Sequence, residues 1–216
     1  MILVDVREAI RSRRSINFFD PGRRIPEGVL EEVIEEANLA PSSFNLQPWE
    51  VVVVKDPEDK RRLRECAFNQ PKVEEASAVL IVASDPMAVE RHIDRVLKSM
   101  VELGYMKAED VERTRPMPFN LYGEMDSERR RLFAVKNASL FAMSLMIAAM
   151  GHGLSTHPMD GFNESKVKEA FGIPGRFVIP MLIAVGYLRD GVTLLPRGLR
   201  RPLEEFVHLG RFSPKD

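Results

Sequence analysis

The sequence predicts one domain of mixed α and β structure, in which helices cover a buried sheet. Two continuous, mainly β-branched runs, Glu50–Val54 and Ala78–Ala83, are too short for amphipathic helices and indicate strands buried on both faces. Helical patterns alternate with these runs, and 216 residues suit a single domain with a full hydrophobic core. On this alternation alone, the sheet would be parallel and doubly wound.

The first two elements are predicted to be helices. Apolar residues at helical spacing predict one helix over Val4–Ser12 and a second from about Pro26 to Leu39. In the second, Pro26 and Glu27 would occupy the first turn, where proline and acidic residues are favoured. Both helices lead directly into loops that could bind a ligand.

Further elements follow along the chain. A third strand is predicted over Val178–Tyr187, and Gly153–Thr156 is a candidate fourth strand. The run Arg115–Gly123 combines two prolines and two aromatic residues with a glycine, which predicts a mobile, partly apolar loop. The remaining helical patterns cover Lys60–Phe68, Pro86–Tyr105, Lys107–Arg115 and Glu164–Phe171.

The longest apolar stretch, Leu132–Met150, approaches the length of a membrane span. It nevertheless contains Lys136, Asn137 and two serines, and three arginines precede it. Its small residues suit close packing against other helices. We therefore predict a buried central helix rather than a transmembrane one.

Composition favours small-molecule partners or self-association. The chain has 31 basic and 32 acidic residues, so its formal net charge of -1 predicts no pull toward nucleic acid or an anionic membrane. Cys66 is the only cysteine, which excludes an intramolecular disulfide framework and fits a reducing, cytoplasmic setting. A packed thiol is the preferred interpretation of Cys66 over a nucleophile. The first residues lack the pattern of a signal peptide.

Two common kinds of site are not indicated. The four histidines show neither metal-ligand nor catalytic-triad spacing, so we predict no metal site and interpret each as a surface or turn residue. No Gly-x-Gly-x-x-Gly motif follows a strand, which argues against a Rossmann dinucleotide site. These histidines are His92, His152, His157 and His208.

The most informative segment is a polar loop between the second helix and the first strand. It offers two hydroxyls and two carboxamides within six positions, and loops between rigid elements are where ligand contacts concentrate. The same residue types also favour a turn at a helix end without any ligand. The loop's candidate ligand-binding residues are Pro41, Ser42, Ser43, Asn45 and Gln47.

A second candidate site follows the first predicted helix. Arg13, Arg14 and Ser15 place two guanidiniums and a hydroxyl at a helix terminus, where they could meet phosphate oxygens with charge-assisted hydrogen bonds. The alternative is a solvated basic helix end.

Together, these two segments resemble the flavin-binding signature of the nitroreductase family. The resemblance implies an α+β, three-layer sandwich, with a mixed, mainly antiparallel sheet flanked by helices and a domain-swapped C-terminal tail. It also implies FMN as cofactor, NADH or NADPH as electron donor, and ping-pong hydride transfer through flavin N5 to a small oxidant such as a nitroaromatic or quinone. Residues 1–216 would form a single FMN-binding domain.

Other segments extend the resemblance. The family's pattern has a basic residue where this chain has Asn17, which would be a weaker polar substitute. Asn69 and Lys72 match residues that reach the ribityl chain and the pyrimidine edge of the flavin. A cation at that edge would stabilise the negative charge gained on reduction.

The segment His157–Asn163 resembles a family turn that lies against the flavin. Pro158 and Met159 lead into it, and a backbone N–H of Asp160 or Gly161 would donate to N5, the hydride-accepting atom. An independent interpretation is a strand-to-helix turn with Asn163 as N-cap, and both can hold together.

The C-terminal segment resembles the family's tail. Arg200 aligns with a phosphate-binding arginine, and Arg197 could reach the phosphate from nearby. Residues from about 197 to 216 would extend onto the partner of a homodimer, and residues from about 100 to 130 would form a variable lid. Alternatives are specialised chemistry in the same family, such as dehalogenation or flavin fragmentation, and non-catalytic flavin binding.

Overall fold

The computed structural model describes residues 5–214, so Val4, the predicted start of the first helix, lies outside the described residues. Four strands form one sheet in the order β1-β2-β4-β3, and each neighbouring pair is antiparallel. The parallel interpretation was therefore wrong, because burial on both faces gives the same sequence pattern whichever way the strands run. The strands are β1 (Trp49–Val54), β2 (Ala78–Ser84), β3 (Ser155–Met159) and β4 (Val178–Gly186).

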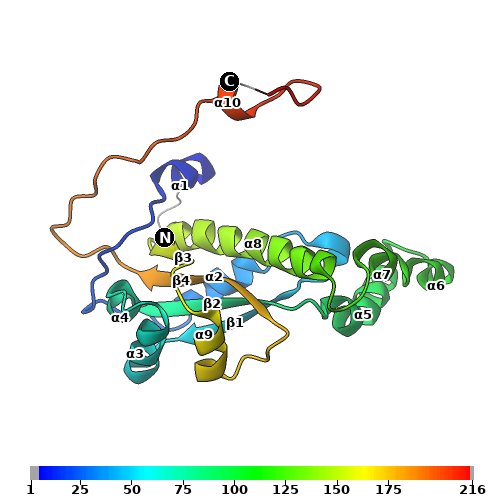
Figure 1. The fold of residues 1–216 in the computed structure, drawn as a ribbon, viewed down its shortest axis with the longest axis horizontal. Coiled ribbons are helices and arrows are strands. Elements are labelled where there is room, and N and C mark those ends of the chain that lie inside the picture. The colour runs from blue at the N-terminus through cyan, green and yellow to red at the C-terminus, as the bar shows by residue number, and fades with distance from the viewer. Residues whose placement is uncertain (1–4, 215–216) are drawn as a thin grey trace.

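Helices cover both faces of the sheet, which confirms the three-layer α+β sandwich (Figure 1). α2 (Val29–Ala37) and the long α8 (Glu128–Gly151) pack on one face. α3 (Pro57–Cys66), α4 (Lys72–Glu75) and α9 (Glu164–Phe171) pack on the other.

Alternating residues of β2 explain the two separate cores. Val79 and Ile81 belong to the cluster under α3, α4 and α9, whereas Leu80 and Val82 belong to the cluster under α2 and α8. Successive side chains of a strand point to opposite faces, so a run of large apolar residues fits only a sheet covered twice. All seven residues of β2 are buried.

The helix α8 is long and apolar enough to cross a membrane by length and composition alone, and half of its most apolar window is buried inside the protein. It packs on α2 and on the sheet, as predicted for a central helix. Part of its surface remains exposed, including Leu132, Leu140 and Met143.

Four short or medium elements extend from one end of the sandwich, and most of them contribute to a third apolar cluster with α8. The predicted loop Arg115–Gly123 is instead largely helical. Pro116 is the N-cap and Pro118 lies in the first turn, where a missing N–H costs nothing, and Tyr122 stacks on Phe133 at 4.3 Å. The elements are α5 (Ala88–Glu102), η2 (Ala108–Asp110), α6 (Val111–Thr114) and α7 (Met117–Tyr122).

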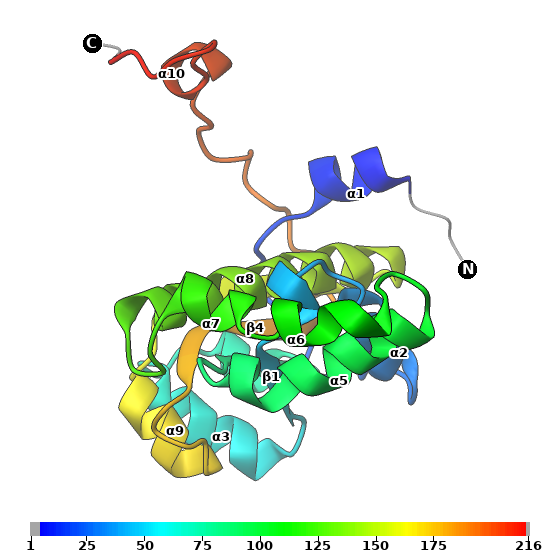
Figure 2. The same cartoon turned by 90° about the vertical axis from the view of Figure 1, so that its right-hand side faces the viewer.

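Both terminal segments lie on the α8 side of the sandwich (Figures 1 and 2). α1 (Val6–Ser12) lies beside α8, while the chain after β4 leads away from the body to α10 (Leu203–Phe206). The predicted second helix begins at Val29 rather than Pro26, because Gly28 at its N-cap has a φ of 84° and interrupts the helical conformation.

Candidate functional site

A cluster of four arginines surrounds the end of α1. Arg13 is the C-cap residue of this helix and is half-buried. Burial lowers the pKa of Arg13, and the positive charges of Arg197, Arg200 and Arg14 lower it further. Among the described residues, no carboxylate contributes to this shift. Four cations therefore gather around the end of α1, which favours binding of a multiply charged anion.

At this cluster, hydrogen bonds join the segment after α1 to the C-terminal segment after β4. Arg14 Nη2 donates to the carbonyl oxygen of Leu195 at 2.9 Å, and Arg197 Nη2 donates back to the carbonyl oxygen of Arg13 at 3.1 Å. Arg200 Nη1 instead donates to carbonyls of its own segment. The structure thus brings all four predicted arginines together, but the side chains of Arg14 and Arg197 already bind backbone.

Ser15 joins the arginine cluster to the sheet. Its Oγ lies 3.5 Å from Arg13 Nη1, and Ser15 forms an isolated parallel bridge with Thr156 in β3. The backbone N–H of Ile16 donates to the carbonyl oxygen of Thr156 at 3.3 Å. This contact supplies the parallel component of an otherwise antiparallel sheet, and it fixes the segment after α1 along the edge strand.

A second polar cluster lies where α4 meets the same segment. Lys72 Nζ donates to Asn17 Oδ1 at 2.8 Å and lies 3.0 Å from His157 Nε2, while His157 Nδ1 lies 2.7 Å from the Ile16 carbonyl oxygen. Burial lowers the pKa of Lys72. Burial also lowers the pKa of His157, with further contributions from Lys72 and Arg13. The lowered pKa of His157 favours a neutral imidazole, which avoids charge repulsion with Lys72.

The turn after β3 is the predicted flavin-facing segment. His157, Pro158 and Met159 lie within β3 rather than after it, and an edge strand tolerates proline because one side of its ladder is free. Asp160 follows with an exposed side chain, and its carbonyl oxygen accepts a hydrogen bond from Phe162 N–H at 2.9 Å.

Gly161 lies where two elements approach closely. Gln70 Nε2 donates to its carbonyl oxygen at 2.7 Å, and a Cβ at position 161 would lie 3.1 Å from that nitrogen. The next element begins as predicted, because the Asn163 side chain caps α9 by accepting from Lys166 N–H at 3.0 Å. Within residues 5–214 the Gly161 N–H forms no hydrogen bond, so it is available to a ligand.

The polar loop before β1 contains η1 (Ser43–Asn45) and is held in an unusual conformation. Asn45 and Gln47 both have positive φ, at 53° and 45°, and Gln47 Nε2 donates to Asn45 Oδ1 at 3.0 Å. Ser42 Oγ accepts from Gln47 N–H at 2.9 Å. The predicted turn chemistry is therefore present, and positive φ at non-glycine residues is strain that often accompanies a binding site.

The predicted loop residues divide by exposure. Pro41 and Asn45 are exposed, whereas the Ser43 N–H is tied to the buried Asn137 Oδ1 of α8 at 3.0 Å. Asn69 resembles Asn45, since it is exposed with a φ of 57° while Arg64 Nε donates to its carbonyl oxygen at 3.1 Å. Backbone contacts thus fix both asparagines and leave their side chains at the surface.

Three residues of the site were missed in the sequence, and for His157 the prediction of a surface or turn position was wrong. His157 lies in β3 and is half-buried against Lys72. Gln70 and Asn137 contact the predicted turn and loop through hydrogen bonds that join distant parts of the chain. Their only sequence signal is proximity to predicted residues for Gln70, and a polar residue in an apolar helix for Asn137.

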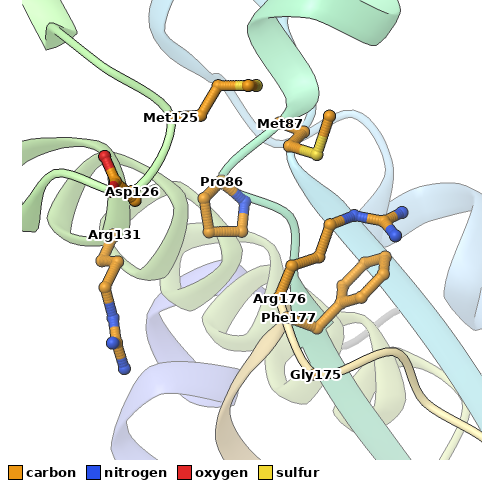
Figure 3. Close-up of a pocket in the computed structure, with 8 residues that line it drawn as sticks. All are labelled: Pro86, Met87, Met125, Asp126, Arg131, Gly175, Arg176 and Phe177. Atoms are coloured by element: carbon orange, nitrogen blue, oxygen red, sulfur yellow. The ribbon is translucent and has the colours of Figure 1, made fainter.

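Of two cavities, the first lies outside these clusters and the second is lined in part by Asn45 of the polar loop. One, of about 290 Å³, is bounded by Pro86, Met87 and Phe177, with the side chains of Arg131 and Arg176 extending away from each other (Figure 3). It contains none of the predicted flavin-binding residues. The other, of about 530 Å³, lies between α5 and the polar loop and is mainly apolar.

The fold and these clusters define an α+β protein with a cluster of arginines beside a polar edge strand. Residues 10–187 match the family described as the Nitroreductase family. A protein of Thermus thermophilus named NADH dehydrogenase is 37% identical over 187 residues, covering 86% of this chain and 87% of the relative. The chain belongs to the nitroreductase family.

Two further similar proteins are an enone reductase and a candidate nitroreductase whose crystal structure contains FMN. The CLA biosynthesis enone reductase of Lactiplantibacillus plantarum is 31% identical over 185 residues, covering 84% of this chain and 85% of that protein. The crystal structure of a candidate nitroreductase of Exiguobacterium sibiricum in complex with FMN has a TM-score of 0.84 and 32% identity, covering 95% of this chain and 97% of that one.

Proposed function

We propose that this protein is a cytoplasmic, homodimeric FMN oxidoreductase that uses NADH or NADPH to reduce a small oxidant such as a nitroaromatic or quinone. The observation that carries the proposal is the pairing of two cationic clusters on one short segment. Arg13 and Ser15 belong to the arginine cluster, and Asn17, two residues further on, belongs to the lysine cluster. A flavin mononucleotide needs cations at its phosphate and a donor at its pyrimidine edge.

The residues present fit this cofactor. The cluster of Arg13, Arg197 and Arg200 suits a dianionic phosphate, with Ser15 as a neutral donor and with Arg197 offering the N–H groups that do not bind the Arg11 and Arg13 carbonyls. Arg14 would contribute through its backbone, because its guanidinium already binds the tail.

The remaining predicted residues would hold the ribityl chain and the ring system. Lys72 retains one ammonium hydrogen beyond those directed to Asn17 and His157 and would direct it to the pyrimidine edge. The polar loop and the turn after β3 would form the two walls of the ring site. The assigned wall residues are Pro41, Ser42, Ser43, Asn45, Gln47, Asn69, Pro158, Met159, Asp160 and Gly161.

When bound, FMN supplies the redox chemistry, accepting hydride at N5 from NADH or NADPH and passing it to the oxidant in ping-pong order. The protein itself would position the flavin and balance the negative charge that the flavin gains on reduction. The free N–H of Gly161 would donate to N5, while the Lys72 ammonium stabilises the negative charge that reduction adds. Asp160 is exposed, so its side chain is assigned no proton transfer.

Dimerisation would complete the site. The segment after Arg197 leaves the body of the protein and carries exposed apolar side chains, among them Leu199 at 91% and Leu209 at 94% exposure. Exposed residues of α8, such as Leu132 and Met143, form a second apolar surface. Exposed apolar side chains on two surfaces are typical of an interface. We therefore propose that residues 197–216 contact the partner subunit and that residues 100–130 form a variable lid.

The test is spectroscopic. The purified protein should carry an FMN absorbance spectrum, and anaerobic addition of NADH or NADPH should bleach it. Adding a quinone, a nitroaromatic or an enone should then restore the oxidised spectrum and rank the oxidants. Protein that binds FMN but is not bleached by either nicotinamide would support non-catalytic flavin binding and contradict the proposal.

A further inference from the structure

His157 connects the two halves of the proposed FMN site. Its Nδ1 lies 2.7 Å from the carbonyl oxygen of Ile16, and its Nε2 lies 3.0 Å from Lys72 Nζ. Ile16 lies between Ser15, beside the arginine cluster, and Asn17, which also accepts from Lys72 at 2.8 Å. One imidazole therefore bridges the segment after α1 and the first residue of α4.

The partners fix which nitrogen carries the proton. A carbonyl oxygen only accepts, so His157 Nδ1 must be the donor to Ile16. An ammonium only donates, so Nε2 must present its lone pair to Lys72. The ring is consequently neutral, in the tautomer with hydrogen on Nδ1.

We propose that His157 is a positioning residue that holds the Lys72 ammonium beside Asn17 and leaves its third hydrogen for the pyrimidine edge of FMN. This inference rests on the proposed function. Lysine is a flexible point charge, and losing its rotamer freedom opposes binding unless other contacts have already ordered it. Asn17 Oδ1 at 2.8 Å and His157 Nε2 at 3.0 Å order the Lys72 side chain before the cofactor binds. Asn17 belongs to the segment that begins at Arg13, and His157 is hydrogen-bonded to it through Ile16.

The electrostatic surroundings agree with this geometry. The charged groups that face His157 are Lys72 and Arg13, and both lower its pKa in addition to the effect of burial, while the Ile16 carbonyl acts in the opposite direction. The ring thus stays neutral where a charged ring would repel Lys72.

Two substitutions of His157 separate its two hydrogen bonds. His157→Asn can keep a donor toward Ile16 but loses the acceptor for Lys72, whereas His157→Gln can place an acceptor near the Nε2 position.

The first experiment needs no cofactor. In the apo protein, ¹⁵N NMR of the His157 ring should show the tautomer with hydrogen on Nδ1. Lys72→Met should raise the pKa of His157, because removing the ammonium removes both its repulsion and its hydrogen bond. A pKa of His157 that does not respond to Lys72→Met would overturn the positioning role even if FMN binds normally.

The second experiment measures the dissociation constants of oxidised and reduced FMN. Lys72→Met should weaken binding of reduced FMN relative to oxidised FMN by about tenfold, which lowers the two-electron potential by about 30 mV. His157→Asn should also weaken binding of reduced FMN relative to oxidised FMN. It should have no further effect on this relative affinity in the Lys72→Met background. His157→Gln should keep most of the wild-type relative affinity.

His152 supplies a matched control. It is half-buried and binds Glu36 rather than the site, so His152→Asn should leave the ratio unchanged. A His157→Asn effect of equal size with and without Lys72 would show that the substitution acts by general destabilisation and would overturn the inference. Wild-type protein that binds no FMN would overturn the proposed function itself.

Discussion

Replacing Arg13 by methionine should weaken FMN binding without destabilising the apo protein. Arg13 is half-buried, and its neighbours Arg197, Arg200 and Arg14 all disfavour its charge. The apo protein therefore holds this guanidinium at a cost that a bound phosphate would offset. Methionine keeps an apolar stem of similar length and removes the charge, so packing changes little.

The two magnitudes follow from the contacts. Losing one charge-assisted hydrogen bond to phosphate costs about 1.5 to 3 kcal/mol, so the dissociation constant for FMN should rise by about ten- to a hundredfold. The contact of Arg13 with Ser15 Oγ is long, at 3.5 Å, and contributes little. The free energy of unfolding of the apo protein should therefore stay within about 0.5 kcal/mol of wild type or increase.

Both quantities can be measured on the same preparation. Quenching of FMN fluorescence on titration with apo protein gives the dissociation constant, and thermal unfolding without FMN gives the stability. Arg95→Met, on the exposed surface of α5, is the matched control and should change neither. An unchanged dissociation constant, or an apo protein clearly less stable than the Arg95→Met control, would refute the assignment of this cluster to phosphate.

Four other outcomes are expected. Deleting residues 197–216 should abolish the dimer and FMN binding together, so a truncated chain that remains yellow and dimeric in size-exclusion chromatography would contradict the tail's role. Asp160→Asn should keep anaerobic flavin reduction within about tenfold of wild type, whereas Gly161→Pro, which deletes the N–H, should slow it by several orders of magnitude if FMN stays bound. Arg130→Met should lower the free energy of unfolding by about 3 kcal/mol, because this buried guanidinium holds an ion pair and two backbone carbonyls. Burial raises the pKa of Cys66, so at pH 8 the thiol should stay protonated in the native protein and react with Ellman's reagent only on unfolding.

The strands and long helices could be predicted because their signal is local. Runs such as Ala78–Ala83 bury every residue, and the structure places β2 there with only one residue added. Strand direction could not be predicted from the same pattern, since it depends on the partners and not on the run itself. The helix α7 was missed because prolines were interpreted as loop residues, although both lie at a helix start where they are tolerated.

In the candidate site, too, residues with a local sequence signal could be predicted, and contacts between distant parts of the chain could not. Arg13, Ser15 and Lys72 could be selected as candidates because each lies in a short motif. The contacts of His157 could not be predicted, because its partners Lys72 and Ile16 are separated from it by 85 and 141 positions, and only the folded sheet brings them within hydrogen-bonding distance. A histidine without a motif gives no indication of such contacts.

The position of the arginine cluster links cofactor binding to assembly. Arg197 and Arg200 belong to the segment that leaves the body of the protein, while Arg13 belongs to the body itself. In the single chain these two arginines already lie beside Arg13, so a partner subunit that orders the rest of the tail would hold its cations at the phosphate, and the phosphate would in turn hold the tail in place. Such linkage is reciprocal, so FMN must strengthen the dimer by the same factor by which the dimer strengthens FMN binding. An anion that relieves the repulsion among these four charges would also hold the tail, and with it the proposed interface, in place.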